Sequence, residues 1–236
     1  MIITGGSSGL GLALAKSTPF PARVVDISRS RPPASAGIEH IAADLADVAA
    51  WSPVASQIHD LVDSEDPERA VLIHAAGTLQ PIGFAGEVDS GAYSRNVVLN
   101  SAAGQILGDA LLRAVRGRSG TYDLVMITSG AARNNYPGWS AYGAGKAALD
   151  QWVRCAGEEQ KIRGGVRVSA IAPGVMDTAM QAGIREMSAE DFPSVERFRD
   201  LHERGELVSP EDAARRMWDA IESGLEPGSV IDLREF

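Results

Sequence analysis

The chain has 236 residues, of which 44% are hydrophobic and 22% are charged, an ordinary globular composition with enough length for a sizeable core. Its formal net charge of −9 at pH 7 disfavours nucleic acid as a partner. The single cysteine, Cys155, excludes an intramolecular disulfide, and no histidine has metal-ligand spacing to it, so we expect no metal site.

From Met1 the chain enters an apolar strand pattern without a basic or long apolar leader, so we expect a soluble, cytoplasmic protein that is not bound to a membrane.

Strand-length apolar runs then alternate with amphipathic segments of helical length. The expected strands are residues 1–4, 23–28, 38–43, 70–76, 122–129, 167–173 and 229–233. The expected helices are residues 9–17, 47–63, 91–117, 140–164 and 210–224.

This alternation predicts an α/β fold, a doubly wound parallel sheet of the Rossmann type, with about seven strands in a three-layer arrangement. The first strand is unusually short, so we expect neighbouring strands to hold it in place. No linker interrupts the pattern, and residues 1–236 are therefore expected to form a single domain.

A glycine-rich loop, residues 4–11, joins the first strand to the first helix. Gly5, Gly9 and Gly11 stand where side chains would block a phosphate, and the following helix N-terminus offers free N–H groups. A glycine loop taken alone fits a simple turn equally well. Its place between a strand and a helix favours a dinucleotide.

The end of the second strand bears on which dinucleotide is bound. Asp26 lies inside this strand, while Ser28 and Arg29 stand at its end. An acidic residue at the end favours NAD, whereas Ser followed by Arg leaves room and charge for a 2′-phosphate. We therefore favour NADP(H), with Arg29 as the partner of the 2′-phosphate. The alternatives are that NAD(H) is bound, and that Arg29 is a solvated loop residue. Asp44 follows the third strand, where its carboxylate can accept a hydrogen bond from the adenine amino group. Alternatively, Asp44, like Asp47, caps the N-terminus of a helix.

Several ordered motifs resemble those of the short-chain dehydrogenase/reductase family, over essentially the whole chain. Besides the glycine loop they are "HAAG" at residues 74–77, Asn100, Ser129 thirteen residues before Tyr142, "YGAGK" at residues 142–146, and "APGVMDT" at residues 172–178. The resemblance implies a cofactor half at about residues 1–115 and a catalytic and substrate half at about residues 116–236. Residues 180–214 and 228–236 resemble the benzil reductase and sepiapterin reductase-like branch, which reduces carbonyls, often vicinal diketones, with NADPH.

The family resemblance implies a catalytic set of Asn100, Ser129, Tyr142 and Lys146. Tyr142 would give a proton to the substrate oxygen, and Lys146, on the same helix face, would lower the pKa of Tyr142 and hold the nicotinamide ribose. Ser129 would bind the substrate carbonyl, and Asn100 would position a water that links Lys146 to solvent. His74 and Ala75 replace two asparagines of the family, and His74 is expected to be structural.

The implied cofactor-binding residues are Gly5, Ser7, Ser8, Gly9, Leu10, Gly11, Ser28, Arg29, Asp44, Leu45, Ala75, Ala76, Gly77, Tyr142, Lys146, Pro173, Gly174, Val175 and Thr178. The expected substrate pocket consists of Ser129, Tyr136, Trp139, Met176 and Met180, with Leu79 and Phe192 as further candidate walls. Gly143 and Gly145 are unfavourable inside a helix, so we expect close approach of another group there.

These features predict an enzyme that uses NADPH to reduce a small carbonyl compound, either a ketone or a vicinal diketone. The alternatives are NAD-dependent oxidation of a secondary alcohol, with Asp26 as ribose acceptor, and a non-catalytic dinucleotide-sensing protein. Retention of both Tyr142 and Lys146 favours an enzyme.

Family members pair two long helices, here about residues 90–116 and 140–163, so we expect a homodimer, with Leu149 and Trp152 either at the interface or in the core.

Overall fold

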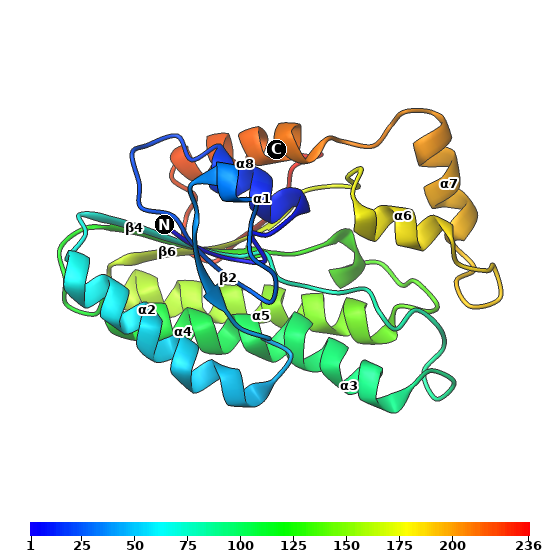
Figure 1. Cartoon of the computed structure of the whole chain (residues 1–236), viewed down its shortest axis with the longest axis horizontal. Coiled ribbons are helices and arrows are strands. Elements are labelled where there is room, and N and C mark those ends of the chain that lie inside the picture. Colours follow the sequence, from blue (N-terminus) through cyan, green and yellow to red (C-terminus); the bar gives the residue numbers. More distant parts are fainter.

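The structure is a computed structural model that describes residues 1–236, and it is built around one seven-stranded sheet (Figure 1). All strands are parallel and follow the order β3-β2-β1-β4-β5-β6-β7. Their bounds are β1 Ile2–Thr4, β2 Val25–Ser28, β3 Glu39–Ala42, β4 Arg69–His74, β5 Thr121–Ile127, β6 Val166–Ala172 and β7 Ser229–Asp232. The predicted strands and doubly wound fold are confirmed.

Helices cover both faces of this sheet (Figure 1). One face carries α2 (Trp51–Glu65), α4 (Gly104–Ala114) and α5 (Ser140–Arg163), and the other carries α1 (Gly9–Lys16) and α8 (Pro210–Glu222). The helix α3 (Ser90–Val97) runs through a π-helical turn, Val98–Ala103, directly into α4. The five expected helices are confirmed. No helix in the chain is long and apolar enough to cross a membrane.

Two helices at one end of the sheet were not predicted from the sequence. They are α6 (Ala179–Arg185) and α7 (Val195–Glu203), which pack together beyond the sheet (Figure 1). The first is only 7 residues long, and the second buries only Val195 and Phe198, so neither carries a long apolar stripe. Their mutual packing, including a bond from Gln181 Nε2 to the Phe198 carbonyl at 3.1 Å, is tertiary information.

The short strand β1 lies at the centre of the sheet, between β2 and β4. It pairs on both sides, and Ile2, Ile3 and Thr4 are all buried, so neighbouring strands hold it as expected. The chain builds outward in one direction from β1 to β3 and in the other from β4 to β7. The boundary between β1 and β4 is thus the topological switch point, the usual place for a ligand in an open α/β sheet.

Each central strand contributes side chains to two separate cores. Leu72 and Leu124 belong to a cluster of 22 buried residues that includes residues of α2, α4 and α5. The adjacent Ile73 and Val125 belong to a cluster of 17 buried residues that includes those of α1 and α8. Because both faces of the sheet are covered, the strands are apolar continuously rather than at every second position.

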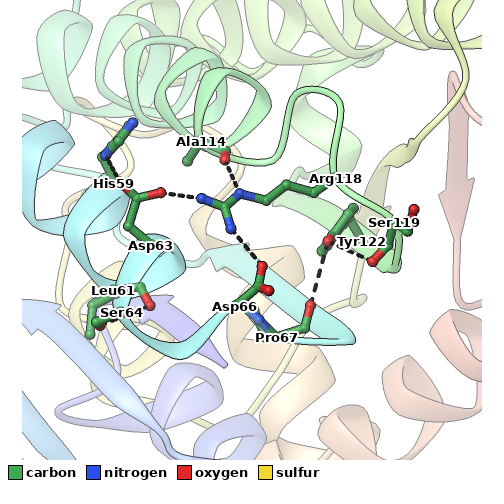
Figure 2. A network of polar contacts seen from close by, with 10 residues as sticks. All are labelled: His59, Leu61, Asp63, Ser64, Asp66, Pro67, Ala114, Arg118, Ser119 and Tyr122. Atoms are coloured by element: carbon green, nitrogen blue, oxygen red, sulfur yellow. Dashed lines mark hydrogen bonds and ion pairs between the residues drawn. The ribbon is translucent and has the colours of Figure 1, made fainter.

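A polar network ties the end of α2 to the start of β5 (Figure 2). The Arg118 guanidinium forms ion pairs with Asp63 and, at 2.6 Å, with Asp66, and its Nε donates to the Ala114 carbonyl at 2.9 Å. Asp66 follows α2 with a left-handed φ of 39°, which brings its carboxylate toward the arginine. This cluster lies at the amino end of β5, whereas the cavity described next lies at the carboxyl ends of the strands.

Candidate active site

One cavity of about 790 Å³ extends along the carboxyl ends of the central strands. Every residue that the sequence analysis assigned to the cofactor lines it, from the glycine loop through Ser28 and Arg29 to Pro173 and Thr178. The expected substrate residues line it too. Of the four expected catalytic residues, Ser129, Tyr142 and Lys146 line the cavity, while Asn100 lies behind its wall.

The glycine loop has the geometry that a pyrophosphate requires. Gly5 has a φ of 71°, and a Cβ there would come within 2.9 Å of the Ala76 backbone, so the loop can pack against β4 only without a side chain. Gly9, also left-handed at 52°, leaves its Cβ position open except for Thr178 at 3.7 Å. Ser8 makes no side-chain cap bond, which leaves the first N–H groups of α1 available to an anion.

The Asp26 carboxylate is fully occupied within the protein. It has 0% exposure, its Oδ1 accepts from Gly6 N at 2.6 Å, and its Oδ2 accepts from Ser28 Oγ at 2.5 Å and lies 3.1 Å from His40 Nδ1. Asp26 does not line the cavity. Its observed role is to fix the glycine loop to the end of β2, and this weighs against Asp26 as an acceptor for a ribose.

Asp44 lines the cavity but is engaged by Arg95, whose Nη2 lies 2.6 Å from Asp44 Oδ2. Its Oδ1 also accepts from Ala46 N at 3.1 Å. The pKa of Asp44 is lowered, because the bonds from Arg95 and Ala46 outweigh the cost of partial burial. The cap expected at Asp47 is confirmed, since its side chain accepts from Ala49 N at the start of a short 3₁₀ turn, Val48–Ala50.

His74 is a buried, neutral residue at the end of β4. Its Nδ1 lies 2.9 Å from Thr4 Oγ1, which also accepts from Ala76 N at 3.1 Å. Burial and the nearby Lys146 ammonium lower the pKa of His74 to about 3. His74 and Thr4 thus link β4 to β1 where the family has an asparagine, and the structural role expected for His74 is confirmed.

Ser129, Tyr142 and Lys146 converge in the cavity from two elements. Ser129 follows β5 and caps the 3₁₀ turn Gly130–Ala132, accepting from Ala131 N at 3.2 Å. Tyr142 and Lys146 lie one turn apart on α5. The Lys146 ammonium is 5.8 Å from the centre of the Tyr142 ring and donates to the Ile127 carbonyl at 2.8 Å.

The protein alone does not lower the pKa of Tyr142, contrary to the sequence-based expectation. Burial raises this pKa, and only the nearby Ser129 hydroxyl opposes the rise. Lys146 donates to the Ile127 carbonyl instead of the phenol, and its own pKa falls to about 8 because of burial, with Asp150 acting in the opposite direction. Within the protein, Tyr142 is therefore a phenol at neutral pH, and nothing in the protein alone activates it toward the phenolate.

Asn100 holds the loop after β4 from within the π-helical turn. Its Oδ1 accepts from Thr78 N at 3.1 Å, and its Nδ2 donates to Thr78 O at 2.7 Å and to Asn96 Oδ1 at 2.8 Å. A Cβ on Gly77 would lie 2.9 Å from Asn100 Oδ1 and 3.6 Å from Lys146 Nζ. Asn100 and Lys146 therefore both adjoin the backbone at Gly77.

The two glycines of "YGAGK" are explained by close packing, as expected. A Cβ on Gly145 would lie 2.8 Å from Asn100 Cβ, and one on Gly143 would lie 3.0 Å from the Ala131 carbonyl oxygen. Contacts below 3.0 Å are not tolerated without movement. Gly145 thus lets α5 approach the π-helical turn that carries Asn100.

The far end of the cavity is aromatic. Tyr136, Trp139 and Phe198 line it, and the Trp139 ring is 5.6 Å from that of Tyr142. Phe192, a candidate wall in the sequence analysis, does not line the cavity; it is fully buried and stacks behind Trp139 at 4.5 Å. Phe192 therefore supports the cavity wall by packing and is not part of it.

Sequence analysis missed several residues that line this end of the cavity. They include Arg197 and Phe198 on α7 and Asp232, Arg234 and Glu235 at the end of β7. The position of β7 in a parallel sheet could have indicated the last three, because residues after a strand gather at the same edge. Arg197, whose Nη1 donates to the Tyr136 hydroxyl at 2.7 Å, depends on the unpredicted α7.

A second hollow of about 210 Å³ adjoins the cavity between the loop after β4 and α6. Gly77, Leu79, Ala179 and Met180 line both spaces. Leu79, Ile82 and Met180 make the hollow largely apolar, and a Cβ on Gly183 would meet nothing within 4 Å. Leu79 and Met180 therefore border open space on two sides, the cavity and the smaller hollow.

The sequence pattern that defines short chain dehydrogenases matches residues 1–189. Together with the sheet order and the cavity, this match shows that the chain belongs to the short-chain dehydrogenase/reductase family, a class of NAD(P)-dependent oxidoreductases. Within that family it falls in the benzil reductase and sepiapterin reductase-like branch of carbonyl reductases. It is 38% identical over 239 residues to benzil reductase ((S)-benzoin forming) of Bacillus subtilis. The aligned region covers 100% of this chain and 98% of that protein.

Two further comparisons agree with this placement. Sepiapterin reductase of Rattus norvegicus is 31% identical over 196 residues, covering 81% of this chain and 73% of that protein. A solved structure from Beutenbergia cavernae, provisionally assigned as an NAD(P) dependent gluconate 5-dehydrogenase, contains NADP at low occupancy. It is 26% identical, has a TM-score of 0.80, and covers 98% of this chain and 93% of that one.

Proposed function

We propose that the protein reduces a small ketone or vicinal diketone with NADPH, and that Tyr142 is the proton donor. The observation that carries this proposal is the convergence of Ser129, Tyr142 and Lys146 at one end of a cavity whose other end is the glycine loop. The glycine loop and the uncapped end of α1 fit the pyrophosphate, and the segment from Pro173 to Met176, together with Thr178, lines the cavity that Tyr142 also lines, where a nicotinamide fits.

The dinucleotide, when bound, supplies the hydride. The Ser129 hydroxyl donates to the substrate carbonyl oxygen and stabilises the negative charge that develops there. The Tyr142 phenol, kept protonated by burial, then gives its proton to the same oxygen. Lys146 remains charged below a pKa of about 8 and binds the nicotinamide ribose, while Asn100 orients a water that reconnects Lys146 with solvent.

Preference for NADPH is supported by the end of β2. Asp26 is fully buried and already accepts from its neighbours, so no carboxylate there is free to bind the ribose hydroxyls. Ser28 and Arg29 line the cavity at this point, and no ion pair engages Arg29. Its guanidinium is suited to a 2′-phosphate. The alternative of NAD-dependent alcohol oxidation through Asp26 has no support from this geometry.

A substrate with a bulky substituent on each side of the reacting carbonyl would use both the cavity and the adjoining hollow, once the Leu79 and Met180 side chains between them move aside. The aromatic end formed by Tyr136 and Trp139 accommodates one group, and the apolar hollow behind Leu79 and Met180 accommodates the other. Benzil reductase of Bacillus subtilis, the relative compared above, is named for a substrate with two aryl groups.

The test is a panel of aromatic and aliphatic ketones and vicinal diketones, with oxidation of NADPH and NADH measured at equal concentration. Tyr142→Phe should abolish turnover while retaining NADPH binding. Ser129→Ala should lower kcat by about 100- to 1,000-fold, the usual loss on removing a donor to a developing oxyanion. Full activity of Tyr142→Phe would contradict the mechanism, and absence of turnover in the wild type with every carbonyl would contradict the function.

We also propose a homodimer formed by the surfaces of α4 and α5. Ile106 on α4 and Ile162 on α5 are exposed apolar side chains, whereas Leu149 is fully buried in the core. Trp152 is half-buried and packs against the core cluster. Light scattering at micromolar concentration should give twice the chain mass, and a monomer mass would contradict this proposal.

A further inference from the structure

A buried carboxylate lies one helical turn beyond Lys146 and has no role in the mechanism so far. Asp150 is on α5, is only 2% exposed, and does not line the cavity. Its Oδ1 is buried without a hydrogen-bond partner. An unpaired buried carboxylate oxygen is costly, so its presence calls for a compensating interaction.

The surroundings of Asp150 are cationic. Lys146 precedes it by one turn and Arg154 follows it by one turn on the same helix, and Arg133 approaches from the end of the 3₁₀ turn after β5. All three favour the charged form of Asp150 and partly offset the rise in its pKa that burial produces. The buried Thr128 hydroxyl, at the end of β5, opposes this rise in pKa more strongly than any of the three cations, of which Arg154 contributes most and Lys146 least.

Two of these cations are less dedicated to Asp150, one because it has another partner and one because it is exposed to solvent. Arg133 is 3.6 Å from the Asp232 carboxylate of β7, which Arg234 also binds. Arg154 is on the exposed side of α5. Lys146, by contrast, is 3% exposed, and its ammonium has only the neutral Ile127 carbonyl as a hydrogen-bond partner.

The other groups around Lys146 do not offset its charge. His74, from β4, is neutral, and the Lys146 ammonium opposes its protonation. Tyr142, from α5, is a neutral phenol whose ring centre is 5.8 Å away. Asp150 is the group that raises the pKa of Lys146 against the effect of burial.

We propose that Asp150 is a positioning residue that keeps the Lys146 ammonium charged at the floor of the cavity, acting through the field of its buried carboxylate one turn along α5. Residues four apart on a helix have Cβ atoms about 5–6 Å apart, close enough for this coupling in a buried setting. The functional consequence rests on the proposed role of Lys146 toward the ribose, but the charge state of Lys146 can be measured without cofactor or substrate.

The chain suits a direct measurement, because its lysines are Lys16, Lys146 and Lys161. Protein labelled with ¹³C at the lysine ε-carbon gives a signal for each, and Lys146→Arg identifies the signal of Lys146 by its loss. In the wild type this signal should titrate with a midpoint near the pKa of about 8. In Asp150→Asn the midpoint should fall by about one pH unit, the smaller end of shifts caused by a close opposite charge.

Two variants serve as controls. Asp150→Glu keeps the charge and should restore most of the wild-type midpoint, whereas Asp109→Asn removes an exposed carboxylate from α4 and should leave it unchanged. If Asp150→Asn does not fold, Asp150→Ser supplies a smaller neutral side chain for the same titration. An unchanged Lys146 midpoint in a folded neutral variant would overturn the proposal.

NADPH affinity, followed by quenching of tryptophan fluorescence, separates this inference from the proposed function. Asp150→Asn should bind NADPH as the wild type does at pH 6, where Lys146 is charged in both proteins, and more weakly at pH 8. Equal loss of affinity at both pH values would indicate a merely structural role and contradict the proposal. A shifted Lys146 midpoint with unchanged affinity would uphold the inference and contradict the ribose-binding role of Lys146.

Discussion

The backbone of Gly145 packs directly against Asn100, since a Cβ on Gly145 would lie 2.8 Å from the Cβ and 3.2 Å from the carbonyl carbon of Asn100. The approach joins α5, which carries Tyr142 and Lys146, to the π-helical turn that carries Asn100. The absence of a side chain at one position therefore sets the distance between two parts of the site.

Gly145→Ala should destabilise the protein by about 1–3 kcal/mol, the usual cost of overpacking, although alanine is the better helix former. It should also lower kcat, because Asn100 and α5 must move apart. Thermal unfolding and turnover measure the two effects. Gly183→Ala in α6, where a Cβ meets nothing within 4 Å, is the matched control for the unfolding measurement and should be neutral or stabilising. An equally stable, fully active Gly145→Ala protein would show that the contact is readily relieved.

Arg29→Ala should weaken NADPH binding by about 10- to 100-fold and leave NADH binding nearly unchanged. The expected size corresponds to loss of a hydrogen bond to a charged group, about 1.5–3 kcal/mol. Dissociation constants for both cofactors measure it. Arg31→Ala is the control, because Arg31 is exposed on the same loop but does not line the cavity. Equal losses for the two cofactors would exclude Arg29 as the partner of the 2′-phosphate.

His74 should make the protein less stable toward acid. Its folded pKa of about 3 lies below the ordinary histidine value of 6.5, so unfolding takes up a proton between these values and stability falls as pH falls. His74→Gln should reduce the slope of unfolding free energy against pH by up to about 1.4 kcal/mol per pH unit in this window. Urea unfolding at several pH values measures both slopes, which should agree above pH 7. Parallel slopes below pH 6 would mean that His74 is protonated in the folded state.

Arg118→Ala should lower stability without affecting catalysis, because the network in Figure 2 is remote from the cavity. Loss of two ion pairs and a bond to the Ala114 carbonyl should cost about 1–2 kcal/mol, less at high salt. Denaturant unfolding and KM are the measurements. Arg113→Ala, which removes one exposed pair with Asp109, should cost under about 0.5 kcal/mol. A changed KM in Arg118→Ala would link this region to the site.

The limits of sequence-based prediction follow from how each feature is encoded. The strands and the five long helices were predictable because a doubly covered sheet leaves continuous apolar runs and amphipathic helices leave periodic ones. The glycine loop and "YGAGK" were readable because chemistry restricts their residue types. In contrast, α6 and α7 have short buried faces, and the contribution of Arg197 to the cavity depends on where α7 packs.

The sequence by itself determined the fold class, the family and many of the residues that line the cavity, from the glycine loop to Thr178. Tertiary structure alone decided three matters of charge. It buried Asp26 against the glycine loop, it buried Tyr142 so that its pKa rises instead of falling, and it buried the Asp150 carboxylate with no hydrogen-bond partner for its Oδ1. The physical reason is that burial and through-space charge depend on distances between elements far apart in the chain, which local pattern and motif spacing do not specify.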